Sequence, residues 1–104
     1  MKVFGGKPRS PRWAGIRKAF LIEHPFCEAC GNAKQDQLEV HHIYPYHLPD
    51  GDQKELDWSN LITLCTGPAK CHFILGHLLS WKSWNPDVIM DAKRFYRKIE
   101  TRPK

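Results

Sequence analysis

The sequence predicts a small α+β domain in which two short strands lie between helices and a bound zinc ion adds stability. The chain has 104 residues, Pro, Gly and charged residues interrupt its apolar runs, and its four cysteines fall into two close pairs. A chain of this length forms a single domain. Because the apolar core must be small and discontinuous, we expect the cysteines to contribute a metal staple.

The N-terminal part predicts a flexible basic arm over residues 1–10, followed by one domain over residues 11–104. The arm carries two glycines and a proline, which disfavour regular structure. Ser10 and Pro11 form a typical helix start, because a serine hydroxyl caps free N–H groups and the first helical turn does not need the N–H that proline lacks. We expect a helix over residues 11–23, with an apolar stripe formed by Trp13, Ile16, Phe20 and Leu21.

The middle of the chain predicts two strands joined by a loop. Residues 37–44, with the sequence QLEVHHIY, and residues 59–64, with the sequence SNLITL, have the β-branched and apolar residues of short strands. Residues 45–58 contain Pro, Gly and four acids, and they predict a solvated loop. Two further helices are expected to begin near Lys70 and at Asn85.

The chain is basic, with a formal net charge of +5 and a pI near 9.2. Positive charge attracts a polyanion such as nucleic acid, although a solvated basic surface without a partner fits the charge equally. The basic residues concentrate toward the two ends of the chain: Lys2, Lys7, Arg9, Arg12, Arg17 and Lys18 at one, and Lys93, Arg94, Arg97, Lys98, Arg102 and Lys104 at the other.

Apolar runs in this sequence are too short to cross a membrane, and the first twenty residues lack the apolar stretch of a secretion signal. We therefore expect a cytoplasmic protein with no membrane partner, whose thiols stay reduced. In such a compartment, thiols paired at short spacing indicate a metal site more often than disulfides.

The cysteines have the spacing of metal ligands. Cys27 and Cys30 are separated by two residues, and Cys65 and Cys71 by five. Two such chelating loops can close a tetrahedral thiolate site, so we expect all four to hold structural zinc. Metal binding then adds to the free energy of folding. The alternatives are buried free thiols and a redox-active pair formed by Cys27 and Cys30.

Three segments near the cysteines carry a second pattern: LEVHHIYP, SNLITLC and CHFILGH. Their order of His-His, Asn and Cys-His resembles the HNH endonuclease family over residues 27–78, and the flanking segments are similar to those of small phage-type members. The resemblance implies a ββα-metal (His-Me finger) domain, in which two strands and a helix surround one divalent ion. It further implies DNA as the partner, the cytoplasm of a bacterial host as the location and, by analogy alone, phage packaging proteins as further partners.

The resemblance also implies roles by position. His42 matches the family's general base, and Asn60 matches the middle residue of the motif, which holds the base-bearing loop by hydrogen bonds. His41 and His72 match metal-binding positions. Because adjacent strand residues point to opposite faces, His41 and His42 can face one centre only if a bulge or a turn lies near them.

His77 is the expected third ligand of the catalytic ion. In colicin-like members this ligand lies four residues after the position of His72, where the present chain has Gly76. Five residues correspond to about 140° around an α-helix, so His77 reaches the same ion only if the helix ends or distorts at Gly76. Helix capping or a substrate contact is the alternative for His77. His47, in the loop, is a candidate contact for phosphate or metal.

Together these roles predict metal-dependent hydrolysis of DNA, as a nick or a double-strand cut. A histidine base activates water, and a divalent ion (Mg²⁺, Mn²⁺, Ni²⁺ or Zn²⁺) stabilises the charge that develops on the phosphate and the leaving oxygen. The resemblance implies products with 5′-phosphate and 3′-hydroxyl ends. The alternative is a non-catalytic, zinc-stabilised DNA-binding module, and RNA as the substrate stays open.

Overall fold

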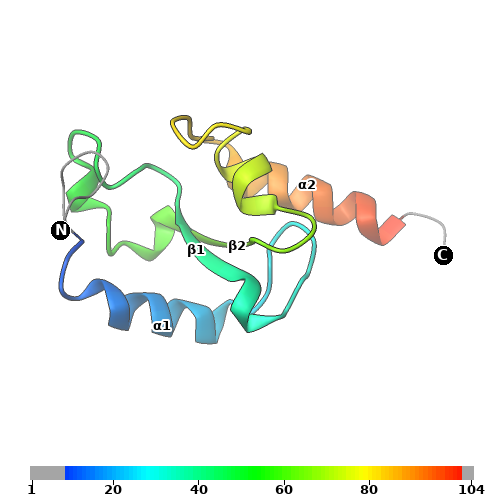
Figure 1. Ribbon diagram of the computed structural model, residues 1–104, viewed down its shortest axis with the longest axis horizontal. Coiled ribbons are helices and arrows are strands. Elements are labelled where there is room, and N and C mark those ends of the chain that lie inside the picture. Colours follow the sequence, from blue (N-terminus) through cyan, green and yellow to red (C-terminus); the bar gives the residue numbers. More distant parts are fainter. Residues whose placement is uncertain (1–8, 102–104) are drawn as a thin grey trace.

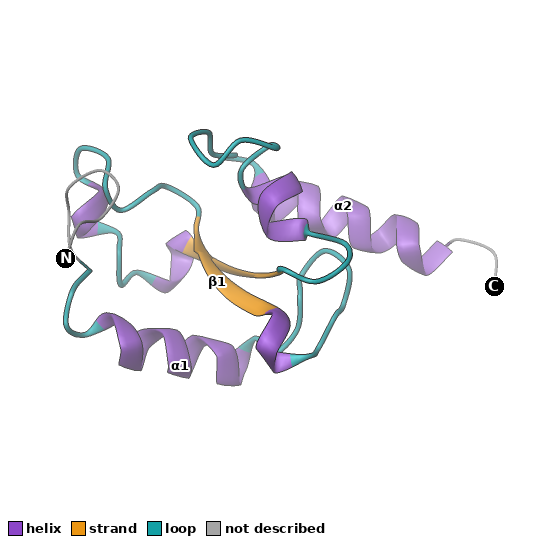
Figure 2. Cartoon of the chain, viewed as in Figure 1, coloured by secondary structure: helices purple, strands orange, loops and turns teal. Residues whose placement is uncertain are grey.

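The predicted α+β architecture is confirmed by a computed structural model, which describes residues 9–101. A two-stranded antiparallel sheet lies between two helices (Figures 1 and 2). Most of the predicted basic arm, residues 1–8, lies outside the described residues. The principal elements are α1 (Trp13–Glu23), β1 (Leu38–His42), β2 (Leu61–Cys65), the short helix η5 (His72–Gly76) and α2 (Val88–Thr101).

The two strands pair in a regular register that starts at Leu38↔Cys65 and ends at His42↔Leu61. The bulge that we considered beside the two histidines is absent from β1, because every residue of the strand has a partner on β2. The chain bends directly after the strand, at Ile43 and Tyr44. The alternation of side chains therefore persists through the histidine pair, and the turn that follows brings the chain back toward it.

Helix α1 covers one face of the sheet. Its buried side chains Trp13 and Phe20 pack with Val40 of β1 and Leu61 of β2. The helix begins at Trp13, two residues after the predicted start, because Pro11 and Arg12 form a turn in which the Ser10 hydroxyl accepts the Arg12 N–H at 3.1 Å.

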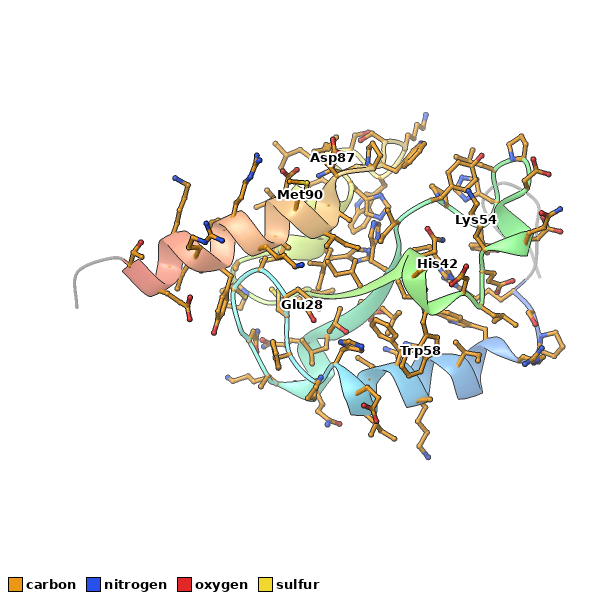
Figure 3. The ribbon with its side chains drawn as sticks, turned by 180° about the vertical axis from the view of Figure 1, so that it is seen from behind. Glu28, His42, Lys54, Trp58, Asp87 and Met90 are labelled. Carbon is orange, nitrogen blue, oxygen red and sulfur yellow. The ribbon has the colours of Figure 1, made fainter. Side chains whose placement is uncertain are left out.

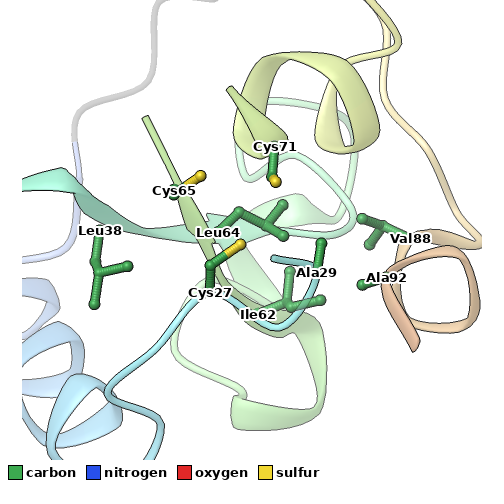
Figure 4. Packing of buried hydrophobic residues seen from close by; sticks show 9 residues of the cluster. All are labelled: Cys27, Ala29, Leu38, Ile62, Leu64, Cys65, Cys71, Val88 and Ala92. Carbon is green, nitrogen blue, oxygen red and sulfur yellow. The ribbon is translucent and has the colours of Figure 1, made fainter. Parts of the chain in front are cut away.

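The other face of the sheet packs against α2 and the cysteines. Ile62 and Leu64 of β2 contact the cluster that contains Val88 and Ala92 of α2, and Figure 4 shows these side chains around Leu64. Helix α2 starts at Val88, where the Asn85 side chain accepts the Asp87 N–H at 2.9 Å, as expected for a cap near Asn85. The far end of α2 then extends away from the sheet (Figure 1).

Among residues 9–101, no helix has both the length and the apolar character needed to cross a membrane.

We expect the packing of Leu64 to dominate the small core. Leu64→Ala removes a side chain that is fully buried between the cysteines and α2, and should lower the free energy of unfolding by about 3 kcal/mol. Ile22→Ala, on the exposed side of α1, is the matched control and should change it by less than about 0.5 kcal/mol. Urea unfolding followed by tryptophan fluorescence measures both variants, and equal losses would contradict this account of the core.

Candidate active site and metal centres

Four sulfur atoms form a compact group, here called the sulfur cluster, made by Cys27, Cys30, Cys65 and Cys71. All four sulfur atoms lie within 4.8 Å of one another, so they could hold a metal ion. Cys27, Cys65 and Cys71 come from the loop after α1, the end of β2 and the start of the short helix, and Figure 4 shows their sulfur atoms pointing to a common centre. The two cysteine pairs that the sequence singled out therefore meet in space.

The loop that carries Cys27 and Cys30 is shaped for this grouping. The Cys30 N–H donates to the Cys27 sulfur at 3.4 Å, and the Gly31 N–H donates to the Cys27 carbonyl at 2.9 Å. Gly31 has a φ of 81°, a conformation that glycine adopts at little cost. The tight turn thus points both thiols of the pair toward Cys65 and Cys71.

The thiols of the sulfur cluster compete for ionisation. A hydrogen bond from Cys71 lowers the pKa of Cys27 to about 5, and that same bond raises the pKa of Cys71. Burial raises the pKa of Cys30 to about 11. The negative charge of one thiolate thus makes it harder for the neighbouring thiols to lose a proton. A divalent cation would offset this repulsion and allow several cysteines to bind it as thiolates.

Three imidazoles form a second group, the histidine cluster, made by His41, His72 and His77. Their ligand atoms all lie within 4.8 Å of one another. Nδ1 of His41 lies 3.0 Å from Nε2 of His72, and the rings of His41 and His77 have centroids 4.8 Å apart. The sequence named these three residues as ligands of one ion, and the fold brings them together.

A helical distortion explains how His77 joins this group. The short helix over His72–Gly76 is a π-helix, whose hydrogen bonds span five residues instead of four. The wider turn returns the chain to the same side after five residues, and the rings of His72 and His77 lie 4.9 Å apart. The distortion that the sequence required at Gly76 is therefore present.

Gly76 itself leaves room for His41. A Cβ atom at this position would lie 3.1 Å from two atoms of the His41 ring, closer than nearly all real Cβ contacts. A side chain here, including the ligand of colicin-like members, would push against the ring. Glycine at position 76 and histidine at position 77 therefore belong to one local arrangement.

The protonation states of the histidine cluster suit metal binding. Burial, followed by repulsion from His72 and His77, lowers the pKa of His41 to about 3, and burial lowers the pKa of His72 to about 4. Neutral imidazole is the form that coordinates metal. Nδ1 of His77 lies 2.9 Å from the Ser83 carbonyl and must donate to it, which leaves the lone pair of a neutral ring on Nε2.

One buried atom in this group has no partner. Nε2 of His41 is inaccessible to solvent and makes no hydrogen bond to any described residue. Such an atom is costly to bury without a partner, which marks the His41 ring as a place where a group outside the described residues would bind.

His42 occupies a different environment from His41. Its ring stacks at a tilt on Trp13 of α1, with centroids 4.4 Å apart, and Nε2 lies 2.9 Å from the Glu55 carbonyl. A carbonyl only accepts, so Nε2 carries the proton and the neutral ring keeps its lone pair on Nδ1. Burial lowers the pKa of His42 to about 4, so the ring is neutral and able to accept a proton at neutral pH.

The loop that follows β1 is folded back toward His42 by Asn60. The Asn60 side chain accepts the Tyr44 N–H at 2.9 Å and donates to the carbonyls of Tyr44 and Lys54, at 3.1 and 3.3 Å. Seen from behind, His42 lies on the side of Lys54, away from Asp87 at the start of α2 (Figure 3). Asn60 does not belong to the histidine cluster, which agrees with a supporting position in the loop.

A cavity of about 320 Å³ joins these features, because it is lined by His42 and by all three members of the histidine cluster. His41 and His42 border it from the end of β1, although they extend from opposite faces of the strand. His47 also lines the cavity, yet it is exposed and is not one of the three grouped histidines.

The sequence did not point to Arg9 or Tyr46 as residues of this cavity. In the sequence, Arg9 is one of the basic residues of the N-terminal arm, and its spacing does not connect it with the histidines. Tyr46 and Trp81 also line the cavity, and Trp81 contacts the rings of His72 and His77 while 62% of it stays exposed. Motif spacing cannot identify Arg9 and Tyr46 as residues of the cavity, because the path of the loops brings them to it.

Comparison with known proteins gives one match. Residues 27–77 match the family model described as HNH endonuclease, and this segment contains both clusters, His42 and Asn60. Searches of curated proteins and of solved structures returned no similar protein.

Loss of the Asn60 side chain should loosen the loop between the strands. Asn60→Ala leaves the Tyr44 N–H and the carbonyls of Tyr44 and Lys54 without their partner in a partly buried place, and should lower the free energy of unfolding by about 2 kcal/mol. The Tyr44 amide should also exchange with solvent faster. Ser59→Ala, at an exposed neighbour, should change little, and a similar loss in both variants in urea unfolding would refute the proposed support by Asn60.

Proposed function

The chain belongs to the HNH endonuclease family over residues 27–77, and we propose that it is a metal-dependent endonuclease that hydrolyses phosphodiester bonds of DNA. The family is one of nucleases that act on DNA with divalent metals, and this match supports the proposed class of activity. The observation that carries the finer proposal is the shared cavity, in which a neutral, oriented histidine lies beside three convergent imidazoles.

His42 is proposed as the general base. The Glu55 carbonyl fixes the proton on Nε2, so Nδ1 is the atom that takes a proton from water. The Trp13 ring holds the imidazole from the side and excludes solvent from it. A fixed tautomer and a fixed ring plane reduce the reorganisation needed when the proton moves.

A divalent cation fits the histidine cluster, because three imidazole side chains converge there and imidazole nitrogen is a good ligand for such ions. His41, His72 and His77 would hold it. When bound, it supplies positive charge that polarises the phosphate and stabilises the departing oxygen. Since no carboxylate belongs to this group of described residues, we propose that it binds Ni²⁺ or Zn²⁺ more tightly than Mg²⁺.

The proposed reaction needs only water, the phosphodiester and the groups named above. The oxygen of water forms a bond to phosphorus as its proton passes to Nδ1 of His42, and the bond from phosphorus to the 3′ oxygen breaks. The departing 3′ oxygen gains a proton from solvent, and His42 releases to solvent the proton that Nδ1 took from water. The products carry 5′-phosphate and 3′-hydroxyl ends.

Structural zinc is proposed for the sulfur cluster. Four cysteine sulfurs without any oxygen or nitrogen ligand favour a closed tetrahedral zinc site. The cluster joins the loop after α1, β2 and the short helix, so an ion there would cross-link three segments, the first of which is far from the other two in the sequence.

The function is tested by nicking of supercoiled plasmid with Mg²⁺, Mn²⁺, Ni²⁺ or Zn²⁺ added in turn, and with EDTA. Wild-type protein should relax the plasmid only with metal, and His42→Ala should be slower by about 10³-fold or more because water loses its base. His24→Ala, outside the cavity, is the matched histidine control and should keep the wild-type rate. Cleavage by His42→Ala at the wild-type rate would exclude His42 as the base. DNA binding by the wild type without cleavage in any metal would favour the non-catalytic module.

The zinc assignment predicts a metal-dependent fold. Purified protein should contain one tightly bound zinc ion, and Cys71→Ser should lose it and unfold at a much lower temperature, since structural zinc contributes on the order of 10 kcal/mol. Ala69→Ser, at an exposed position two residues earlier, should keep both. Elemental analysis and thermal unfolding measure the two effects. A Cys71→Ser protein with full zinc content and unchanged stability would disprove the assignment.

A further inference from the structure

Arg9 lies outside the segment that matches the family, yet it reaches the cavity of the proposed active site. Its guanidinium carbon lies 4.8 Å from the centre of the Tyr46 ring and 5.2 Å from that of the Trp13 ring. The ring of His42 contacts the same two aromatic side chains, with centroid distances of 5.7 and 4.4 Å. Arg9 and His42 are therefore held by one pair of aromatic rings.

The backbone next to Arg9 is also tied to His42. The Ser10 N–H donates to the Glu55 carboxylate at 2.9 Å, while the carbonyl of Glu55 orients the His42 ring. Glu55 is buried, so this link is shielded from water. Glu55 thus connects the backbone beside Arg9 with the ring of His42.

The Arg9 guanidinium has no anionic partner among the described residues, where the ion pairs are Arg17 with Glu39 and His24 with Glu28. A guanidinium presents five N–H donors in a plane and stays charged at all physiological pH values. The contacts with the Trp13 and Tyr46 rings hold the guanidinium near the cavity without a hydrogen-bond acceptor from either ring system. Within residues 9–101, no carboxylate competes with an anion in the cavity for these donors.

We propose that Arg9 binds the non-bridging oxygens of the scissile phosphate and stabilises their charge while water attacks. The inference rests on the proposed nuclease function and adds to it a residue from the N-terminal arm. The shape of the site favours this role over a general attraction for DNA, since Arg9 shares its aromatic support with the proposed base. Paired hydrogen bonds from a guanidinium suit two phosphate oxygens, which a lysine cannot contact in the same way.

The test compares Arg9→Ala, Arg9→Lys and the charge-matched control Arg12→Ala, which lies three residues away, is exposed and does not line the cavity. Each variant is first checked for zinc content and thermal stability. Single-turnover cleavage of DNA at saturating protein gives the rate of the chemical step. Binding of a short duplex in EDTA, followed by the NMR shift of the Trp13 indole N–H, reports whether phosphate occupies the site without any cleavage.

We expect Arg9→Ala to reduce the single-turnover rate by about 100-fold, because one donor group to the developing charge is lost. Arg9→Lys should restore only a part of that rate, and Arg12→Ala should weaken binding slightly while the rate at saturation stays near that of wild type. DNA should shift the Trp13 signal in wild type and in Arg12→Ala, but not in Arg9→Ala.

An Arg9→Ala protein that cleaves at the wild-type rate, or that shows the wild-type Trp13 shift, would overturn the inference. If the wild type fails to cleave DNA with every metal tested, the proposed nuclease function fails. In that case the Trp13 shift still decides whether Arg9 binds phosphate.

Discussion

The convergence of four sulfur atoms is the constraint on which the rest of this molecule depends. Each strand has only five residues, and the buried core is split into two small groups on the two faces of the sheet. The sulfur cluster lies where the loop after α1, the end of β2 and the start of the short helix come together. Apolar burial alone gives so short a sheet little stability. The register of β1 on β2 therefore depends on the interactions that keep the sulfur cluster together at the end of β2.

The position of the sulfur cluster also determines where the histidine cluster lies. Cys71 belongs to the sulfur cluster and His72, the next residue, belongs to the histidine cluster, so one step along the chain connects the two candidate metal centres. The regular pairing of β1 then presents His41 to the histidine cluster and His42 to Trp13, on opposite faces. A single cavity at the end of the strand is reached from both faces, which is why no bulge is needed to bring the histidine pair to one site.

Much of this arrangement could be predicted from the sequence, because it depends on spacing. The cysteine pairs, the histidine doublet and Asn60 have fixed distances along the chain, and turns and strand alternation convert these distances into positions. Other features depend on contacts that spacing does not encode. The spacing of His72 and His77 showed that a helical distortion was needed, but it did not show that the distortion would be a π-helical turn. The position of Arg9 near His42 involves the hydrogen bond from Ser10 to Glu55, which are far apart in the sequence. The helix start at Trp13 differs from the expected one because Pro11 closes a separate turn first.

The adjacency of Cys71 and His72 has a consequence for the life of the protein in a cell. A newly made chain without an ion at the sulfur cluster would have no fixed start for the short helix, and therefore no ordered place for His72 and His77. Under the proposed zinc assignment, the histidine cluster would therefore become ordered only when zinc is bound at the sulfur cluster.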